Sequence, residues 1–323
     1  MSLSTKASNF IENNRIVSER DCFSNVLAEY DSWRTFMQSK FEKRAKSLVE
    51  VEKRLVNFDA TFGKEKFDQF KSKLGCSTFI YTVDSIPVEG FVIKPKTSGK
   101  KLPVLVYNRG GNGRSGSVLF GPKMHFLFPI ASEGFVVVGS QYRGSMTKAD
   151  NLDEFGGKDV NDVLTLIEHI PLIKDADPNR VGMYGASRGG MQTHLAMKQA
   201  KNIKAIATIA GATDLSLGLT IRPIMERVYK HRIPNYEDNK VAELEKRSVV
   251  NWVNELSPAV PILLMHGTAD EKVSVKHSVL LAEELSKHNI PHELALYQGD
   301  NHGLWKHKQD SEQKLVEWFK QHL

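Results

Sequence analysis

The first 73 residues carry hydrophobic side chains at helical spacing. Charged residues separate them, and no proline interrupts the segment. The hydrophobic positions recur at steps of three and four residues: Phe23, Val26, Leu27, Tyr30, Trp33, Met37 and Phe41. This spacing is typical of amphipathic helices, and Gly75 ends the pattern. The chain therefore predicts a helical N-terminal arm over residues 1–75 and a second unit over residues 76–323.

After residue 75 the pattern changes to short β-branched and aromatic segments. Residues 78–83 and 88–93 flank a polar turn at Asp84 and Ser85, which predicts an antiparallel hairpin. Six more short apolar segments follow, at residues 104–107, 135–138, 181–184, 205–209, 262–265 and 293–297. Apolar strands separated by helical stretches are typical of a parallel sheet covered on both faces. We therefore expect an α/β fold with an eight-stranded, mostly parallel sheet.

Two connections between these strands stand out. Val160, Val163, Leu164 and Ile167 fall on one helical face before Pro171, which predicts a covering helix there. The connection over residues 211–261 is unusually long and has a helical pattern of its own. Long excursions of this kind are often functional, so we expect a lid-like insertion. Its residues Ile221, Met225, Tyr229 and Trp252 are candidates for lining a pocket or for core packing.

Composition and charge narrow the class of protein. The chain has 323 residues, of which 41% are hydrophobic and 25% charged, as in folded globular proteins. The net charge of +6 comes from interleaved acids and bases, which argues against a nucleic-acid partner. The sequence starts without a signal-peptide pattern and contains no apolar stretch long enough for a membrane span. We expect a cytoplasmic protein with no membrane partner.

The two cysteines carry little information at this level. Cys22 and Cys76 lie far apart, with no CxxC motif and no Cys/His ligand spacing. We expect two buried reduced thiols, with neither a disulfide nor a zinc site.

The strongest local signal is GASRGG at residues 185–190, directly after an apolar strand and directly before a helical stretch. Ser187 is the centre of G-x-S-x-G. A strand that turns at once into a helix strains the central residue and needs small neighbours, and it presents the hydroxyl in open space. Ser187 is therefore the candidate nucleophile.

A serine nucleophile needs a histidine base and a carboxylate that orients it, each in a loop after a later strand. Asp270, in HGTAD, and His302, in GDNHG, have that order and placement. Asp214 is kept as a weaker alternative acid, and Asp300 is too close in sequence to His302 to orient it. Among the other histidines, His194 is interpreted as a packing residue and His266 as support for the Asp270 loop.

The tetrahedral intermediate needs two donors directed at its oxyanion. One is expected to be the backbone N–H of Arg188, directly after the nucleophile. The glycine-rich loop at residues 108–113 is expected to supply the other, from Gly111, although a purely structural turn is an alternative. The loop lacks the spacing of a nucleotide-binding motif, and no P-loop lysine follows it.

Residues 76–323 resemble the catalytic domain of the prolyl oligopeptidase family, a branch of the α/β-hydrolases that contains serine peptidases and esterases. The resemblance rests on motifs in the family's order: VEGFVIKP (88–95), the glycine loop (108–113), QYRGS (141–145), GGKDVND (156–162), GASRGG, HGTADEKV (266–273) and GDNHG (299–303). It implies an α/β-hydrolase fold, Ser187, Asp270 and His302 as the catalytic triad, and Gly111 with Arg188 as the oxyanion hole.

Three departures from the family pattern bear on the site. Arg109 and Asn112 stand where members often have His and Pro of His-Gly-Gly-Pro, and Arg188 stands where an aromatic residue is common. Arg188 either attracts a substrate carboxylate or, as we favour, forms a salt bridge beneath the turn. Arg143 is interpreted as a structural ion-pairing residue. Many members also carry a β-propeller of at least four blades of roughly 40 residues, which a 75-residue arm cannot form.

The chain is thus expected to be a serine hydrolase that cleaves carboxylic ester or peptide bonds through an acyl-enzyme, without metal or cofactor. The substrate is a small acyl ester or a short peptide, and the missing propeller favours the ester. A catalytically inactive ligand-binding protein on the same scaffold is the alternative, since fold does not imply activity. The arm is expected to pack beside the site or to mediate homo-oligomer formation. The acyl group, the leaving group and the oligomeric state are left open.

Overall fold

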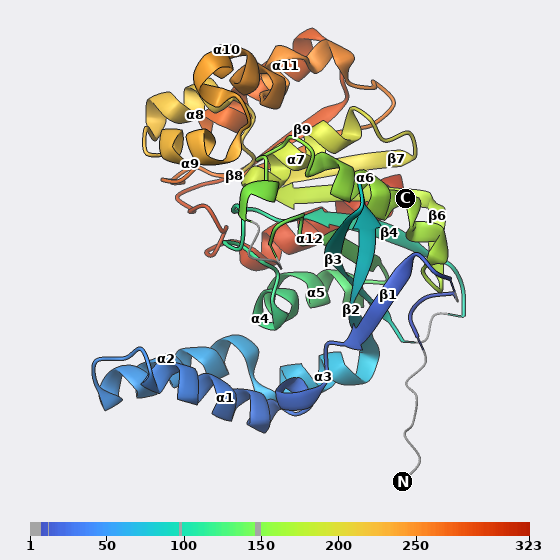
Figure 1. Cartoon of the computed structure of the whole chain (residues 1–323), viewed down its shortest axis with the longest axis vertical. Coiled ribbons are helices and arrows are strands. Elements are labelled where there is room, and N and C mark those ends of the chain that lie inside the picture. Colours follow the sequence, from blue (N-terminus) through green and yellow to red (C-terminus); the bar gives the residue numbers. More distant parts are fainter. Residues whose placement is uncertain (1–7, 12, 97–98, 146–149) are drawn as a thin grey trace.

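A nine-stranded sheet is the centre of the molecule (Figure 1). The computed structural model describes residues 8–11, 13–96, 99–145 and 150–323. In spatial order the strands are β1 (Ile16–Asp21), β2 (Leu74–Val83), β3 (Ile86–Pro95), β5 (Val136–Ser140), β4 (Leu102–Asn108), β6 (Ala176–Ala186), β7 (Ile203–Ile209), β8 (Ile262–Gly267) and β9 (His292–Tyr297). The pairs β1–β2, β2–β3 and β3–β5 are antiparallel, and all later pairs are parallel. This is the α/β-hydrolase arrangement that the sequence predicts.

All eight predicted strands are present, and the structure adds one that the sequence analysis missed. Strand β1 lies in the arm that was expected to be helical throughout, and it pairs with the outer side of β2. Its burial alternates weakly, and its sequence, IVSERD, is mostly polar. An edge strand needs little apolar surface, so its hydrophobic pattern gives little signal.

Helices cover both faces of the sheet. The α-helices of the described residues are α1 (Tyr30–Glu42), α2 (Leu48–Phe62), α3 (Lys64–Lys73), α4 (Phe120–Pro122), α5 (Phe128–Ser132), α6 (Val160–Glu168), α7 (Arg188–Met197), α8 (Leu215–Ile221), α9 (Met225–Arg232), α10 (Tyr236–Arg247), α11 (Lys276–Lys287) and α12 (Lys308–His322). One core cluster joins α6, α7 and α11 to the sheet, and the other joins α3, α5 and α12 to it. On β4, Val104 and Val106 belong to the first cluster and Leu105 to the second, as the alternation of a strand requires.

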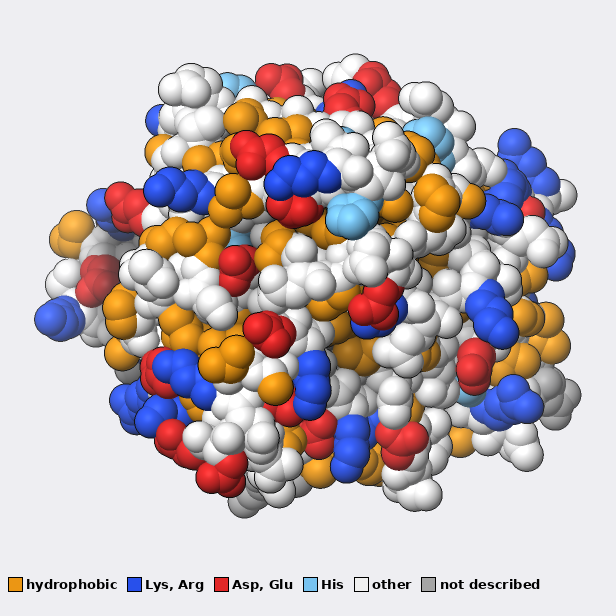
Figure 2. All heavy atoms as spheres, turned by 90° about the horizontal axis from the view of Figure 1, so that it is seen from above, with side chains coloured by type: hydrophobic (Ala, Val, Ile, Leu, Met, Phe, Trp, Pro, Cys, Tyr) orange, Lys and Arg blue, Asp and Glu red, His pale blue; other side chains and the backbone are white. Residues whose placement is uncertain are grey.

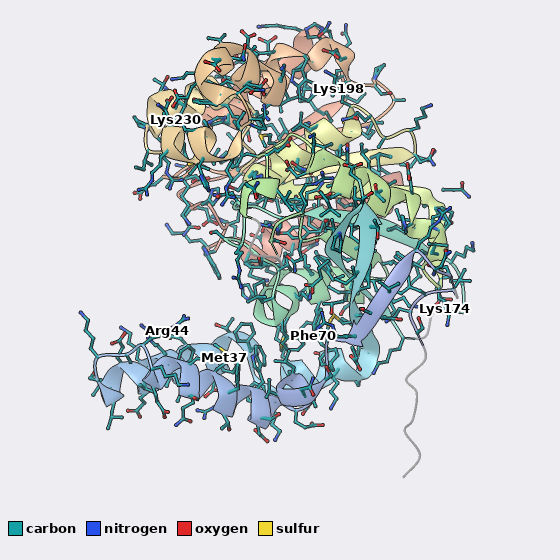
Figure 3. All side chains as sticks on the ribbon, viewed as in Figure 1. Met37, Arg44, Phe70, Lys174, Lys198 and Lys230 are labelled. Carbon is teal, nitrogen blue, oxygen red and sulfur yellow. A yellow bond between two sulfur atoms is a disulfide. The ribbon has the colours of Figure 1, made fainter. Side chains whose placement is uncertain are left out.

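The arm projects from the body as a helical hairpin of α1 and α2 (Figure 1). Its base is an aromatic cluster in which Trp33 contacts Phe58 and Phe120, with ring centroids 4.7 and 4.9 Å apart. Met37 and Arg44 lie on the projecting hairpin, whereas Phe70, on α3, lies next to the body (Figure 3). Edge-to-face contacts of this kind add about 0.5–1.5 kcal/mol each to burial, so the hairpin is fixed to the body at its base. Self-association through the arm stays a prediction.

The expectation of two reduced thiols is wrong, because Cys22 and Cys76 form a disulfide. Strand β1 is the physical reason: it runs beside β2 and brings Cys22 opposite Cys76, with the Cα atoms 5.3 Å apart and the Cys22 N–H donating to the Cys76 carbonyl. The two cysteines are 54 residues apart in the sequence, so their pairing could not be predicted without strand β1. Disulfides are typical of oxidising compartments, so the bond counts against the expected cytoplasmic location, which stays a prediction.

The long connection between β7 and β8 contains helices α8, α9 and α10, which lie together at one end of the molecule (Figure 1). We call residues 211–261 the cap. Acidic and basic side chains are intermixed over the face that Figure 2 shows. Of the helices in the described ranges, none combines the length and apolar character that crossing a bilayer demands.

Candidate active site

The candidate residues meet at one edge of the sheet. Strands β4, β6, β7, β8 and β9 are neighbours and run parallel, so the loops that follow them leave from the same edge. Ser187 directly follows β6, Asp270 follows β8, and His302 follows β9. Ligand sites of open α/β sheets lie at this carboxyl edge.

The turn at Ser187 has the geometry that the GASRGG motif predicts. Ser187 has φ 59° and ψ −125°, a strained conformation for a residue with a side chain. A Cβ on Gly185 would lie 2.1 Å from the Gly189 carbonyl oxygen, and one on Gly189 would lie 2.0 Å from the Asn108 carbonyl oxygen. Neither position has room for any side chain. The two glycines therefore let β6 turn at once into α7 while β4 passes beside the turn.

Asp270 and His302 are hydrogen-bonded to each other. The distance between Asp270 Oδ2 and His302 Nδ1 is 2.7 Å, and the Asp270 side chain is fully buried. The His302 side chain is 20% exposed, so one side of the ring is open. An Nδ1–H that donates to a carboxylate leaves Nε2 unprotonated, which is the tautomer that a general base requires.

The Asp270 carboxylate has four partners. Its Oδ1 accepts the backbone N–H groups of Lys272 and Val273, at 2.8 and 3.0 Å. Its Oδ2 is also 3.2 Å from Nε2 of His266, whose Nδ1 contacts the Ser278 hydroxyl. Burial acts to raise the pKa of Asp270, but the hydrogen bonds from both histidines and from Val273 hold it well below its usual range. Asp270 is therefore ionised, and His266 supports the Asp270 loop, as expected.

Ser187 and His302 line one cavity of about 680 Å³. No hydrogen bond joins the Ser187 hydroxyl to the His302 ring among the described residues. Hydrogen bonds between catalytic groups are often long without substrate and shorten in the complex. The structure thus brings Asp270 and His302 into contact, and places Ser187 and His302 in the wall of the same cavity.

The glycine loop packs directly against the Ser187 turn. A Cβ on Gly110 would lie 3.0 Å from the Ala186 carbonyl oxygen and 3.3 Å from Ser187 Cβ, so only glycine allows this approach. Gly111 has φ +74°, in the left-handed region that favours glycine. The loop therefore brings its backbone N–H groups close to the nucleophile.

The Arg109 side chain fixes the orientation of this loop. Its guanidinium is 1% exposed and donates to the carbonyl oxygens of Gly110, Gly113, Ser115 and Gln141, at 2.6–3.1 Å. Because the C=O and N–H of a trans peptide point in opposite directions, a Gly110 carbonyl held by Arg109 directs the Gly111 N–H away from Arg109. Burial lowers the pKa of Arg109 to about 10, and Arg109 stays charged at neutral pH.

The expected salt bridge beneath the turn is present. Arg188 is 3% exposed and donates to both carboxylate oxygens of Asp153, at 2.8 and 2.7 Å, and to Asp159 at 2.7 Å. It also donates to the Gly111 carbonyl at 2.9 Å. Its charge is neutralised by two buried acids, so the alternative of an Arg188 side chain that attracts substrate is not favoured.

Asp153 links Arg188 to the glycine loop. Asp153 Oδ2 accepts the Gly113 N–H as well as the Arg188 guanidinium. Burial acts to raise the pKa of Asp153, but the Arg188 charge and the hydrogen bonds lower it to about 2. The sequence analysis missed Asp153, Asp159 and the role of Arg109, since no motif joins residues so far apart in the chain. The one available signal was the substitution of arginine at two positions where the family pattern has other residues.

The weaker candidates have structural roles. Asp214 caps α8, with Oδ1 accepting the N–H groups of Ser216 and Leu217. Asp300 accepts hydrogen bonds from its own loop and from His307. His194 is fully buried on α7, and Arg143 forms ion pairs with Asp162 and Asp84, as expected.

Two of the four cap residues singled out in the sequence line the cavity. They are Met225 and Tyr229. Ile221 is 45% exposed, and Trp252 belongs to the core. Within the described ranges, no group of three or more His, Cys, Asp or Glu side chains is placed to hold a metal ion.

Comparisons with known proteins show the family of this chain. The model of the prolyl oligopeptidase family matches residues 123–323, more than half of the chain. The chain is 27% identical over 259 residues to the "Uncharacterized peptidase YtmA" of Bacillus subtilis, covering 80% of this chain and 98% of that protein. It is 24% identical over 257 residues to acylamino-acid-releasing enzyme 1 of Oryza sativa subsp. japonica, covering 74% of this chain and 32% of the plant enzyme.

A solved structure shows the same fold. The acylaminoacyl peptidase of Pyrococcus horikoshii superimposes with a TM-score of 0.67 at 23% identity, over 79% of this chain and 43% of that protein. The chain thus spans the Bacillus relative almost entirely but less than half of the plant and archaeal enzymes. The fold, the strained serine between its two glycines and the matched family model lead to one assignment. This chain belongs to the prolyl oligopeptidase family of serine peptidases.

Proposed function

We propose that this protein hydrolyses amide bonds of short peptides through an acyl-enzyme, with Ser187 as nucleophile, His302 as general base and Asp270 as the residue that orients His302. The observation that carries the proposal is the 2.7 Å hydrogen bond between the buried Asp270 side chain and His302, which lines the same cavity as Ser187. Each of the three roles is filled by a side chain suited to it. This favours an enzyme over an inactive binding protein.

The first half of the reaction forms the acyl-enzyme. Ser187 Oγ attacks the scissile carbonyl carbon as His302 Nε2 takes the hydroxyl proton, and the carbonyl oxygen becomes an oxyanion. When the intermediate collapses, the C–N bond breaks and His302 gives its proton to the leaving amine. Water then attacks the ester, with His302 again as base, and releases the acid and free Ser187.

The oxyanion is stabilised by two backbone donors, the N–H groups of Arg188 and Gly111. Arg188 is the first residue of α7, and the first N–H groups of a helix have no partner within it. The Gly111 N–H is directed away from Arg109, as described above. Donors fixed before the reaction starts need no reorganisation when the charge appears, which is why they lower the barrier.

The substrate class is proposed from the names of the relatives. The Bacillus and Pyrococcus relatives are named as peptidases, so we propose peptide amides before simple esters, contrary to the preference in the sequence analysis. The cap, residues 211–261, is proposed as the lid-like wall that encloses the acyl part of the substrate. Met225 and Tyr229 supply part of that wall.

The test is a set of variants assayed with short peptide p-nitroanilides and with p-nitrophenyl acetate. Ser187→Ala and His302→Gln are expected to lower kcat by roughly 10³-fold or more, because each removes a reacting group. His307→Gln is the matched control: it also changes a histidine bound to an aspartate after β9, but His307 is not part of the cavity wall. Full activity of Ser187→Ala would refute the proposal. A wild-type protein that binds these substrates without turning them over would favour the binding protein.

A further inference from the structure

A second polar group lines the Ser187 cavity and has no role in the steps above. It belongs to the wall formed by the cap and the start of α11, and it includes His277. His277 is 3% exposed, and its Nδ1 accepts the backbone N–H groups of Thr213 and Asp214, at 3.2 and 3.3 Å. Burial lowers the pKa of His277 to about 4, so its ring is neutral at pH 7. With Nδ1 as acceptor, the proton is on Nε2, and this N–H donates to no residue that the structure describes.

Tyr229 adds a second donor beside it. Tyr229 is 4% exposed and lines the same cavity, and its hydroxyl has no hydrogen-bond partner among the described residues. A Cβ on Gly218 would lie 3.8 Å from the Tyr229 hydroxyl and 3.8 Å from His277 Nε2. Both donors therefore face the same point on α8. Neither donor atom is among the fully buried polar atoms that lack a partner, so both are open to the cavity, where a ligand or water can accept from them.

Arg222 brings a positive charge to this wall. It is the residue after α8, it donates its N–H to the Gly218 carbonyl at 2.8 Å, and its side chain is exposed at the cavity. No ion pair of its guanidinium is found in the described part of the chain. We call His277, Tyr229 and Arg222 the donor cluster.

The remaining charges on the cavity wall do not cancel Arg222. Asp214 is the one acid among the described lining residues; capping α8 leaves its negative charge in place, but Arg222 and Lys272 outnumber it. Lys272 is a second exposed cation in the lining, again without an ion pair in the described ranges. The rest of the wall near the donor cluster is apolar, from Phe155 and Val228.

The donor cluster lies next to the nucleophile. Ala212, two residues before Asp214, donates its N–H to the Ser187 carbonyl at 3.2 Å, so the start of the cap passes directly beside the catalytic turn. An acyl group bonded to Ser187 would extend along this wall. Its apolar part would contact Phe155 and Val228, and a polar end would reach the donors.

We propose that the donor cluster binds a carboxylate on the acyl part of the substrate, so that the protein prefers glutamate or aspartate directly before the scissile bond. Two neutral donors and one cation match a carboxylate, which has two acceptor oxygens and one negative charge. An amine would meet two donors and a like charge. This inference rests on the proposed peptidase function and names the class of peptide.

The experiment compares N-acetyl-Glu p-nitroanilide with N-acetyl-Gln p-nitroanilide, which differ in charge but hardly in size. We expect kcat/KM to be higher for the Glu substrate by about tenfold, the size of one hydrogen bond to a charged group. The preference should fall as salt is added, because Arg222 is exposed and its charge is screened.

Two variants test the cluster, and a third is the control. Arg222→Gln removes the cation, and His277→Asn keeps an acceptor for the Thr213 N–H while removing the Nε2–H. Both are expected to bring the Glu to Gln ratio to about threefold or less. Arg227→Gln removes an equal charge from α9 at a residue outside this cavity lining, one helical turn before Lys230, and should keep the ratio. Figure 3 labels Lys230 in the cap.

Equal rates for Glu and Gln, or a preference for an N-acetyl-Lys substrate, would overturn this inference while leaving the proposed function intact. If even p-nitrophenyl acetate is not hydrolysed, the proposed function itself fails and the inference fails with it. If Arg227→Gln abolishes the Glu preference as fully as Arg222→Gln does, the preference comes from the overall charge of the cap. That result would also overturn the role of the donor cluster.

Discussion

Replacing Arg188 by lysine separates the stability of the Ser187 turn from the chemistry of the oxyanion hole. Arg188 makes four side-chain hydrogen bonds: two to Asp153 and one to Asp159, all buried, and a half-buried one to the Gly111 carbonyl. A lysine ammonium keeps the charge but has three donors in a different geometry, so at least one of these bonds is lost. A hydrogen bond to a charged group contributes about 1.5–3 kcal/mol. For a chain of this size the loss lowers Tm by roughly 2–4 °C.

The same substitution should lower kcat, because Arg188 holds the Gly111 carbonyl, and movement of that peptide shifts the adjoining Gly110–Gly111 peptide, whose N–H is the proposed oxyanion donor. Removing a whole oxyanion donor costs about 10²–10³ in kcat, and we expect a displaced one to cost roughly 10-fold or more. KM should change little, since the oxyanion forms only during the reaction. The measurements are thermal unfolding by circular dichroism and steady-state hydrolysis of p-nitrophenyl acetate.

Arg143→Lys is the matched control for this experiment. Arg143 is 2% exposed and is also bound to two aspartates, Asp162 and Asp84, but neither it nor these partners line the cavity. We expect a similar fall in Tm with kcat unchanged. If Arg188→Lys leaves kcat at the wild-type value, or if both variants lower kcat equally, the Arg188 side chain does not position the oxyanion loop.

Three further predictions concern the rest of the structure. Cys22→Ala, or reduction of the Cys22–Cys76 disulfide, should lower the free energy of unfolding by about 4 kcal/mol, because the bond closes a loop over a separation of 54 residues. Denaturant titration with and without reductant measures this difference, and equal unfolding curves would contradict it. Gly189→Ala should abolish activity, because the new Cβ would lie 2.0 Å from the backbone oxygen of Asn108, which cannot move out of β4. A variant that is stable and active in the ester assay would show that the turn has room for a side chain. The pKa of Asp153 is lowered to about 2 in the folded chain, so its stabilisation is present above pH 4 and is lost as pH falls toward 2; it should amount to about 2–3 kcal/mol. Urea unfolding between pH 2 and 6 should therefore show a shallower acid loss for Asp153→Asn, and identical slopes would contradict the pKa.

The strands of the sheet could be predicted because their physics is local. A parallel strand covered on both faces must be apolar along its whole length, as residues 104–107 and 262–265 are, and each such segment is visible on its own. Strand β1 lies at the sheet edge and contains Ser18, Glu19 and Arg20, so its conformation is set by pairing with β2 rather than by its own pattern. The disulfide depended on that pairing and was missed for the same reason.

The candidate triad residues could be predicted because chain order and strand ends determine their placement. Ser187, Asp270 and His302 each follow a strand, and parallel strands bring these loops to one edge. The supports of the site could not be predicted in this way. Asp153 reaches Arg188 across 35 residues, and His277 enters the cavity from a helix start that carries no catalytic motif. Such contacts depend on packing in three dimensions, which no sequence spacing encodes.

The most direct test of the central claim is covalent labelling of the nucleophile. A fluorophosphonate should react with the native protein and leave one phosphonyl group, which peptide mass spectrometry should locate on Ser187, with loss of all p-nitrophenyl acetate hydrolysis in proportion to labelling. Heat-denatured protein and Ser187→Ala should not react. A label on any other residue, or hydrolysis that continues after Ser187 is fully modified, would contradict the claim that this serine is the nucleophile.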